Sequence, residues 1–528
     1  MTAKQRLAGH WAGCDRRRFL RQAGLLAGGA ALALHGWPVL AAEPLKIPRR
    51  KPRTANIGVF GVGHYTYWGQ FPGLRDELLG KLEVFVKRVE KQAVKVTSFG
   101  MIDDAKGATA LLPKLKAAQL DLVFCDMLTY ATSSTFGIII RELQVPVVLV
   151  ALQPQKALDY TKASTYKQLA NDDFCSVPEF TGVAIRMGKK APPVILGTLH
   201  DDPQAEAEVA EWCNIAKVMH DLRGARIGHF GLVLVSMYDM HTDPTALTAA
   251  FGLHVVQTEA DDILRLFRKV GEADTAAKKK QILEMFDTPD PQSDPITRKL
   301  TETDLDMAAR TAVALDQFVE EKQLDGLAYY YEGEPESDLR RVLSSLIVGN
   351  SLLTAAGFPM CGESDLKTCV AMLIEDRLDI GGSFAEFHPL DFNEGFVLVG
   401  HDGPHHVNIA DGKPKLRSLL KYHGKPGSGA SVEFKIKEGP LTMLSIGVTA
   451  KGKFKFVIAE GQSVRGPIPP TGNTNTRGFF KPDVRTFLKR WAAAGPTHHF
   501  ALGVGKHAQT LKKIADALDL ENVIIAGA

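Results

Sequence analysis

The sequence predicts an α/β fold: two doubly wound α/β domains followed by a β-rich C-terminal domain, an antiparallel barrel or sandwich. Apolar strand-like runs alternate with helical patterns as far as "DGLAYYY", which ends at Tyr331. From about Gly381 onward, short β-prone pieces separated by turn residues follow one another instead. Such spacing is typical of an antiparallel sandwich or barrel. A chain of 528 residues also exceeds what one hydrophobic core usually serves, so several domains are expected.

The first α/β domain is predicted to occupy residues 43–220. The strand-like run "ANIGVFGVG" precedes a helix whose apolar residues share one face, namely Leu74, Leu78, Leu82, Phe85 and Val89. The runs "KVTSFG", "DLVFCD" and "VPVVLVAL" are separated by further helical patterns. Strands that alternate with helices indicate a parallel sheet covered on both faces.

A second set begins with "PPVILGTL" and a helix over residues 205–222, and continues through "ARIGHFG". We therefore expect a central α/β domain at residues 221–360. The β-rich domain is expected at residues 361–528, with the pieces "GFVLVGH", "SVEFKIK", "LTMLSIGVTA" and "KFKFVIAE" as strands. A helix–strand–helix–strand run closes the chain.

Residues 1–42 have the anatomy of an export signal. A basic start precedes an apolar run at residues 24–34, and small residues lie around Ala42. The apolar run is too short to span a membrane, so no membrane anchor is expected. "RRRFLR" at residues 16–21 resembles the twin-arginine signal, whose route carries folded proteins. We expect recognition by the Tat export machinery and a periplasmic location.

Charge and cysteine usage exclude two classes of function. The net charge of +3 and the absence of a basic stripe interleaved with aromatic residues give no support for nucleic-acid binding. Apart from Cys14 in the signal, the cysteines are an odd, scattered set without CxxC spacing: Cys125, Cys175, Cys213, Cys361 and Cys369. They predict neither a disulfide framework nor a thiolate metal site, and we expect them to be buried apolar residues.

A glycine-rich turn, "GVFGVGHY" at residues 58–65, raises the question of a nucleotide loop. It lacks the full GxGxxG pattern, and no Walker lysine follows. A plain strand–turn–helix connection with a polar lip is the favoured interpretation.

Two acids stand in unusual settings later in the chain. Glu363, in "CGESDLKTCVAMLI", directly precedes an apolar helix with Leu366, Val370 and Leu373 on its buried stripe. By itself, such an acid indicates only a helix N-terminus. Glu386, in "GGSFAEFHPLDFNEG", has phenylalanines on both sides. Glu386 is therefore a stronger candidate for a functional acid than Glu363, because burying an unpaired carboxylate is costly.

Two histidine-bearing segments complete the set. His401 ends the strand in "VLVGHDGPHH", and His498 and His499 are neighbours in "GPTHHFALG", interpreted as a short strand. Because adjacent side chains in a strand point to opposite faces, only one histidine of this pair is expected to face a site. Two carboxylates and two imidazoles suit Mn²⁺, Mg²⁺ or Co²⁺.

The segments "GESDLKT", "GGSFAEF", "VLVGHDGP" and "GPTHHFALG", in this order, resemble the metal-site segments of the L-arabinose/L-fucose isomerase family. The resemblance implies that Mn²⁺, or else Mg²⁺ or Co²⁺, is held by Glu363, Glu386, His401 and His499. It implies that Glu363 and Glu386 are the catalytic pair and that His498 is turned away or lies behind the ligands. It also implies a homo-oligomer.

The activity implied by the resemblance is metal-dependent aldose–ketose isomerisation of a free pentose or hexose, L-arabinose-like or L-fucose-like, through an ene-diol. The N-terminal half departs from the family, because "GHYTYWG" replaces its Gln-His-Leu-Tyr segment. The substrate contacts expected are His64, Tyr65 and, in "AYYYEGE", Glu332, although the last segment also fits a plain strand-to-helix boundary. The alternatives are an exported sugar-binding protein without catalysis and a metal-dependent epimerase or isomerase of a modified sugar.

Overall fold

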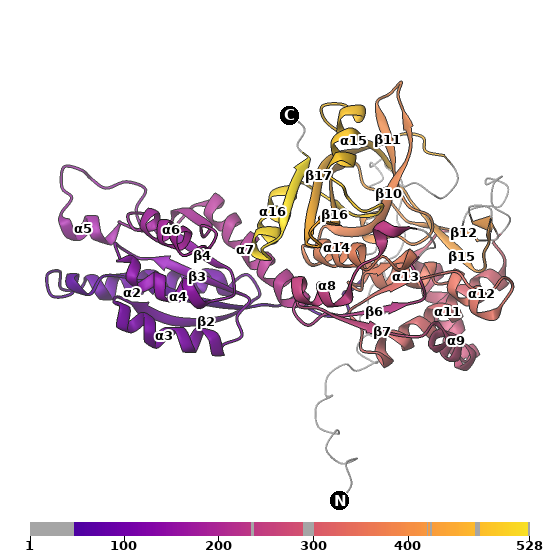
Figure 1. Ribbon diagram of the computed structural model, residues 1–528, viewed down its shortest axis with the longest axis horizontal. Helices are drawn as coiled ribbons and strands as arrows, with labels where there is room; N and C mark the ends of the chain where they lie inside the picture. Colours follow the sequence, from indigo (N-terminus) through magenta and orange to yellow (C-terminus); the bar gives the residue numbers. More distant parts are fainter. Residues whose placement is uncertain are drawn as a thin grey trace, which may run out of the picture. The chain divides into compact units, whose positions relative to one another are not determined.

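The computed structural model describes residues 47–233, 237–288, 300–419, 421–422, 425–469 and 476–525 (Figure 1). The export signal predicted at residues 1–42 lies outside these described residues. Within the described ranges, none of the helices has the length and apolarity needed to cross a bilayer.

The first sheet is parallel and has the strand order β2-β1-β3-β4-β5. Its strands are β1 Asn56–Val62, β2 Lys95–Ile102, β3 Leu122–Met127, β4 Val147–Gln153 and β5 Val194–Thr198. Between them lie α2 Leu74–Glu90, α3 Ala105–Ala117, α4 Ser133–Glu142, α5 Thr165–Ala170 and α6 Val177–Arg186. The five apolar residues predicted for one face of α2 are all buried. The sequence grouped "PPVILGTL" with the second set of elements, but β5 pairs with β4 and completes this first sheet.

After α7 (Pro203–Leu222), a second parallel sheet has the order β7-β6-β8-β9. Its strands are β6 Arg226–Phe230, β7 His254–Gln257, β8 Gly326–Tyr329 and β9 Met360–Cys361. The helices between them are η3 Tyr238–Met240, α8 Pro244–Phe251, α9 Ala260–Lys269, α10 Glu272–Met285, α11 Glu302–Glu321, α12 Asp338–Ser344 and α13 Ile347–Ala355. Strands β6, β8 and β9 are neighbours, so the loops after them meet at one edge of the sheet.

The C-terminal part closes into a barrel. The sheet order β16-β19-β10-β11-β18-β17 is closed by pairing of β16 with β17, and β20 adds to β17 in parallel. The strands are β10 Gly381–Asp391, β11 Phe396–Gly400, β16 Gly439–Val448, β17 Phe454–Val464, β18 Thr476–Phe479, β19 Phe500–Val504 and β20 Glu521–Ile525. The final helix–strand–helix–strand run is formed by α15 (Val484–Ala493), β19, α16 (Ala508–Ala517) and β20.

One predicted barrel strand lies elsewhere. "SVEFKIK" contributes to β15 (Ala430–Glu433), which pairs with β12 (Lys415–Ser418) in a separate two-stranded sheet. Two further short strands, β13 (Lys421–Tyr422) and β14 (Lys425–Pro426), pair with each other. This segment is therefore an excursion between β11 and β16, because its strands pair with one another and not with the barrel strands.

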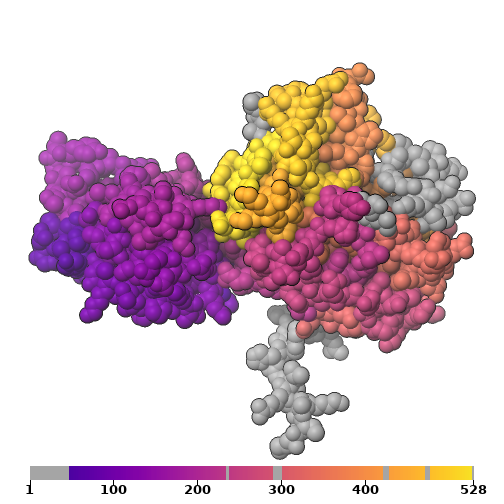
Figure 2. Space-filling model, viewed as in Figure 1, coloured from indigo at the N-terminus to yellow at the C-terminus, as the bar shows by residue number. Residues whose placement is uncertain are grey.

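Helix α14 (Leu366–Arg377) joins the second sheet to the barrel. It contacts β8 and β9 on one side and β10, β16 and β19 on the other, and the surfaces of the two parts adjoin in Figure 2. All of its residues are buried, so the helix is enclosed all round and does not have the single buried stripe predicted for it. The domain boundaries at residues 220 and 360 stay predictions.

The described cysteines form no disulfide. Cys125, Cys213, Cys361 and Cys369 are buried, as expected, whereas Cys175 is exposed and the expectation of burial is wrong for it.

Candidate metal centre and active site

Glu363 lies in a strained turn between β9 and α14. Glu363 and Ser364 both have left-handed backbones, with φ of 59° and 58°. Non-glycine residues adopt this conformation only when their surroundings enforce it, often at functional sites. Here the Ser364 hydroxyl donates to the carbonyl of Phe230 at 3.0 Å, and the Asp365 carboxylate caps α14 by accepting from the Thr368 amide at 3.1 Å. The turn is therefore fixed on both sides of Glu363.

Glu386 and His401 are brought together by strand register. Glu386 on β10 is paired with Gly400, the last residue of β11, and His401 follows directly. The Glu386 Oε1 atom lies 4.0 Å from His401 Nε2 and 3.7 Å from His388 Nε2. His401 Nδ1 lies 3.0 Å from the carbonyl oxygen of Asp402, which can only accept. The Nδ1 atom therefore carries the proton, and the Nε2 lone pair is available to a ligand.

The two adjacent histidines precede β19, which begins at Phe500, so the prediction that they lie in a strand is wrong. Strand alternation does not apply, and each ring contacts a different glutamate. His499 Nε2 lies 3.5 Å from Glu363 Oε2, and His498 Nε2 lies 2.6 Å from Glu386 Oε2. His498 is therefore not turned away. Its backbone amide also donates to Asp239 Oδ2 at 2.7 Å.

His499 has the surroundings of a metal ligand. It is fully buried, and its Nδ1 lies 3.3 Å from Oδ2 of the equally buried Asp365. A carboxylate behind an imidazole fixes the tautomer that leaves Nε2 unprotonated. This Nε2 is buried and makes no hydrogen bond to any described residue. Because buried nitrogens are rarely left unpaired, these residues fit a bound divalent cation.

The four expected ligands converge. Two groups of side chains each place three possible ligand atoms within 4.8 Å of one another. The first group is Glu363, His401 and His499, and the second is Glu386, His498 and His499. Asp365 is the addition that sequence reasoning missed. His498, which was expected to be turned away or to lie behind the ligands, contacts Glu386. Asp365 was hidden by its position as the helix cap, a role that it also fills.

The two glutamates are in opposite electrostatic states. Burial raises the pKa of Glu363, although the nearby His499 opposes the shift. Burial also favours a higher pKa for Glu386, but the hydrogen bond with His498 and the nearby His401 bring it down to about 2. Burial lowers the pKa of His401 to about 3. The pKa values of the two carboxyl groups are therefore shifted in opposite directions.

A pocket opens beside Glu363. It is lined by Tyr331, Arg340, Glu363, Phe384, His401 and residues around them. Tyr331 and Glu363 meet there because they follow the neighbouring strands β8 and β9. Glu332 is not among the lining residues, but its Oε1 lies 3.8 Å from the Arg340 guanidinium and its Oε2 accepts from Tyr330 at 3.1 Å. Sequence reasoning missed Arg340, since an arginine early in a helix carries no distinctive signal.

His64 and Tyr65 lie in a different place. They follow β1, where the His64 ring is 5.2 Å from that of Tyr67 and 5.8 Å from that of Tyr130. The helix α2 begins only at Leu74, after the short η2 helix Tyr65–Tyr67. The residues that line the Glu363 pocket do not include His64 or Tyr65 of the same chain.

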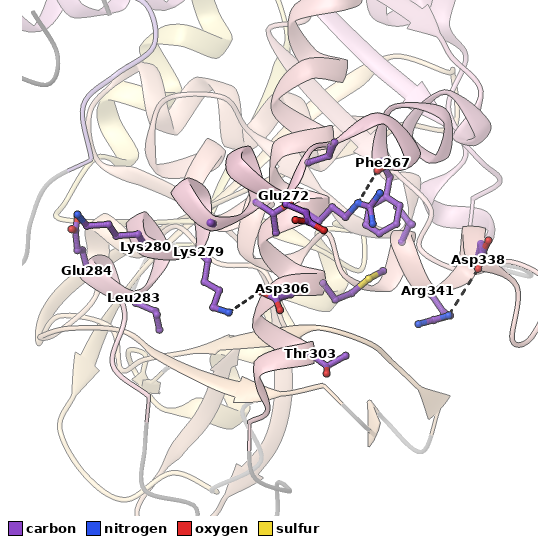
Figure 3. A pocket seen from close by; sticks show the side chains of 16 residues that line it. Phe267, Glu272, Lys279, Lys280, Leu283, Glu284, Thr303, Asp306, Asp338 and Arg341 are labelled. Atoms are coloured by element: carbon purple, nitrogen blue, oxygen red, sulfur yellow. Dashed lines mark hydrogen bonds and ion pairs between the residues drawn. The ribbon is translucent and has the colours of Figure 1, made fainter. Parts of the chain in front are cut away.

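A second hollow lies among α9, α10, α11 and α12 (Figure 3). Two of its cationic side chains have partners within it: Lys279 Nζ lies 2.7 Å from Asp306, and the Arg310 side chain donates to the carbonyl of Phe267 at 3.0 Å. It contains none of the predicted site residues. Because acidic and basic side chains both line this hollow, its charge does not indicate a particular ligand.

Comparison with known proteins supports an isomerase. Residues 381–521 match the L-arabinose isomerase C-terminal domain, a span that contains Glu386, His401 and both adjacent histidines. The L-arabinose isomerase of Nocardioides sp. is 25% identical over 391 residues, which are 72% of this chain and 76% of that protein. That of Aeromonas hydrophila is 23% identical, covering 66% of this chain and 68% of its own length. That of Geobacillus thermodenitrificans is 22% identical, covering 66% and 69%.

A solved structure described as a putative two-component system response regulator/ggdef domain protein covers 62% of this chain and 98% of its own, with 8% identity and a TM-score of 0.22. A likeness this low carries no argument about the fold or the function.

The fold and these matches define an isomerase of the intramolecular oxidoreductase class, a sugar aldose–ketose isomerase. In sequence the chain is similar to L-arabinose isomerases, and its residues 381–521 match their C-terminal domain.

Proposed function

We propose that the chain isomerises a free aldose with the help of a divalent cation held by Glu363, Glu386, His401 and His499. Mn²⁺ is our first choice, with Mg²⁺ or Co²⁺ as alternatives. The observation that carries the proposal is the Nε2 of buried His499, which has no hydrogen-bond partner among the described residues and lies 3.5 Å from Glu363 Oε2. The names of the relatives support an L-arabinose-like pentose or a related hexose as the substrate.

Isomerisation moves a proton between C1 and C2 of the sugar through an ene-diol, so it requires an acid and a base. A bound cation would supply stabilisation of the negative charge that develops on the sugar oxygens. Glu363 and Glu386 are suited to the proton transfers because their pKa values are shifted in opposite directions. His498 would keep Glu386 oriented and ionised through its 2.6 Å contact.

His64, Tyr65 and Glu332 remain proposed substrate contacts. Glu332 would act through Arg340, which lines the pocket. Because His64 and Tyr65 do not line the Glu363 pocket of their own chain, they would have to reach the sugar from a second copy. This requirement agrees with the homo-oligomer that the family resemblance implies.

We also propose a periplasmic location, reached through the Tat export machinery. The support is the "RRRFLR" sequence and the apolar run that follows it.

The test uses Glu363→Gln and Glu386→Gln, with Glu83→Gln on the exposed side of α2 as the matched control. Each protein is incubated with Mn²⁺ and a panel of pentoses and hexoses in D₂O. We expect each site variant to lose at least about a hundredfold in ketose formation, the lower range for removal of an acid–base group. The control should keep the activity of the unaltered chain.

Deuterium at C1 or C2 of the sugar reports the proton transfer directly. If no sugar yields ketose or exchanges deuterium, with or without Mn²⁺, the isomerase proposal is wrong. Sugar binding without conversion would then favour the exported binding protein, and epimerised aldose would favour the epimerase.

A further inference from the structure

The pocket beside Glu363 contains a single fixed cation. Arg340, on α12, is the only lysine or arginine among the described residues that line it. Its side chain is 12% exposed, so the guanidinium is largely removed from bulk water. A neutral sugar offers hydroxyl groups, and recognising them does not require a buried positive charge. The presence of Arg340 in this pocket therefore needs a reason.

The guanidinium of Arg340 is held only weakly by the described residues. Its closest acid is Glu332, at 3.8 Å from the Nη1 atom, which is beyond hydrogen-bond length. No hydrogen bond joins the guanidinium to any described residue, and the other contact is with the Tyr331 ring, 5.8 Å from its centroid. A guanidinium carries five donors. None of the Arg340 nitrogens is buried without a partner, so any that lack one are accessible from the pocket or the surface.

Another arginine in the chain shows the two-oxygen contact that a guanidinium can make with a carboxylate. Arg49 donates from Nη1 to Asp376 Oδ1 at 3.1 Å, and its Nη2 pairs with the other oxygen of the same carboxylate. This two-oxygen contact is the arrangement that a planar guanidinium prefers. Arg340 lacks such a partner among the described residues, and it lines the same pocket as Glu363.

We propose that the substrate is an aldose that carries an anionic group, a carboxylate or a phosphate, on a carbon away from C1 and C2, and that Arg340 binds this group. The inference rests on the proposed isomerase function and names its substrate class. Arg340 and Glu363 line the same pocket, so one sugar could contact both.

The test compares three aldoses that share one configuration: D-galactose, D-galacturonate and D-galactose 6-phosphate. Their C2 to C4 centres match those of L-arabinose, and only the group on C5 differs among the three. With Mn²⁺ present, we expect kcat/KM for at least one anionic sugar to exceed that for D-galactose tenfold or more, since charge-assisted pairs are the strong hydrogen bonds. A preference for the uronate identifies a carboxylate, and a preference for the phosphate ester identifies a phosphate.

The variants are Arg340→Gln, Arg340→Lys and, as the matched control, Arg341→Gln. Arg341 is the next residue on α12, is 60% exposed and lies 3.9 Å from Asp338 (Figure 3). R340Q should lower the preference for the anionic sugar at least tenfold, and R340K should retain part of it because the charge remains. R341Q should leave the preference unchanged. Circular dichroism and metal content verify that each variant folds.

Binding distinguishes failure of this inference from failure of the isomerase proposal. L-Galactonate, the reduced form of the uronate, and galactitol are titrated calorimetrically, because neither can be isomerised. Conversion of D-galactose without any anionic preference overturns the inference and leaves the isomerase intact. Loss of conversion of every sugar, with L-galactonate binding that R340Q weakens tenfold, supports the anion site and rejects the isomerase. Equal binding of both analogues overturns the inference.

Discussion

His498 and His499 are adjacent in the chain, yet they contact different glutamates of one cluster. His499 is fully buried with Asp365 behind it, whereas His498 is exposed and bonded to Glu386. The family resemblance indicated His499 as the ligand, and its surroundings fit that role. We expected only one of the two histidines to face a site, because adjacent side chains in a strand point to opposite faces. This expectation was wrong, since the strand begins only after the pair, at Phe500. The contact of His498 with Glu386 could therefore not be predicted from the sequence pattern.

The first prediction separates the two histidines. His499→Ala should lose nearly all bound Mn²⁺, because a ligand is removed from a buried site. His498→Ala should keep most of the metal but lose activity, because Glu386 loses its 2.6 Å partner. Asp365→Asn should weaken metal affinity about 10- to 100-fold, as expected for a group that orients a ligand. Metal bound per chain after dialysis is the measurement, and retention by H499A together with loss by H498A would contradict the assignment.

At the scale of elements, the strands and helices were predictable where their apolar periodicity is strong, as in α2 and the strands of the first sheet. Helix α14 was misjudged because three of its apolar residues were interpreted as a single stripe, although residues 369–374 are a continuous apolar run and the whole helix is enclosed. Its other side is covered by pairing of charged groups, such as Asp376 with Arg49. Strand partners were not predictable either. β16 and β17 form a local hairpin, but the barrel also depends on pairing of strands that are distant in the chain, such as β10 with β19.

A second prediction concerns Glu375 in α14. Both carboxylate oxygens are buried without a hydrogen-bond partner among the described residues, and burial raises the pKa of this carboxyl well above its usual value. Below about pH 4.3, the ordinary pKa of a glutamate in an unfolded chain, the Glu375 carboxyl is neutral in both the folded and the unfolded protein. As the pH rises above that value, only the unfolded chain ionises, so stability falls until the folded pKa is reached.

Glu375→Met should therefore stabilise the metal-free protein, by about 1–3 kcal/mol at pH 8, the usual cost of an unsatisfied buried polar group. The gain should shrink toward pH 4, where the carboxyl is neutral in the unfolded chain as well. Urea unfolding midpoints across this pH range are the measurement, and Glu83→Met serves as the exposed control. A loss of stability that is equal at both pH values would indicate that the Glu375 carboxyl has a partner.

At the scale of the whole molecule, the succession of two parallel α/β sheets and a closed barrel was predictable from the change in periodicity along the chain. The site was not predictable from spacing, because its ligands are scattered over residues 363–499. They converge because α14 packs on both the second sheet and the barrel. The family resemblance supplied the ligands, while Arg340 and Asp365 became visible only through their contacts.

The last prediction concerns export of the folded chain. The ligand cluster exists only after α14 and the barrel have assembled, so a metal bound in the cytoplasm requires a route that carries folded protein. The described cysteines are free, so folding does not depend on disulfide formation in an oxidising compartment. Replacing Arg16 and Arg17 with lysine should trap the protein in the cytoplasm with its metal bound, whereas the control Arg6→Lys should still be exported. Cell fractionation and metal analysis of each fraction measure the outcome. Undiminished export of the double variant would exclude the twin-arginine route, and metal-free protein in the cytoplasm would show that loading follows export.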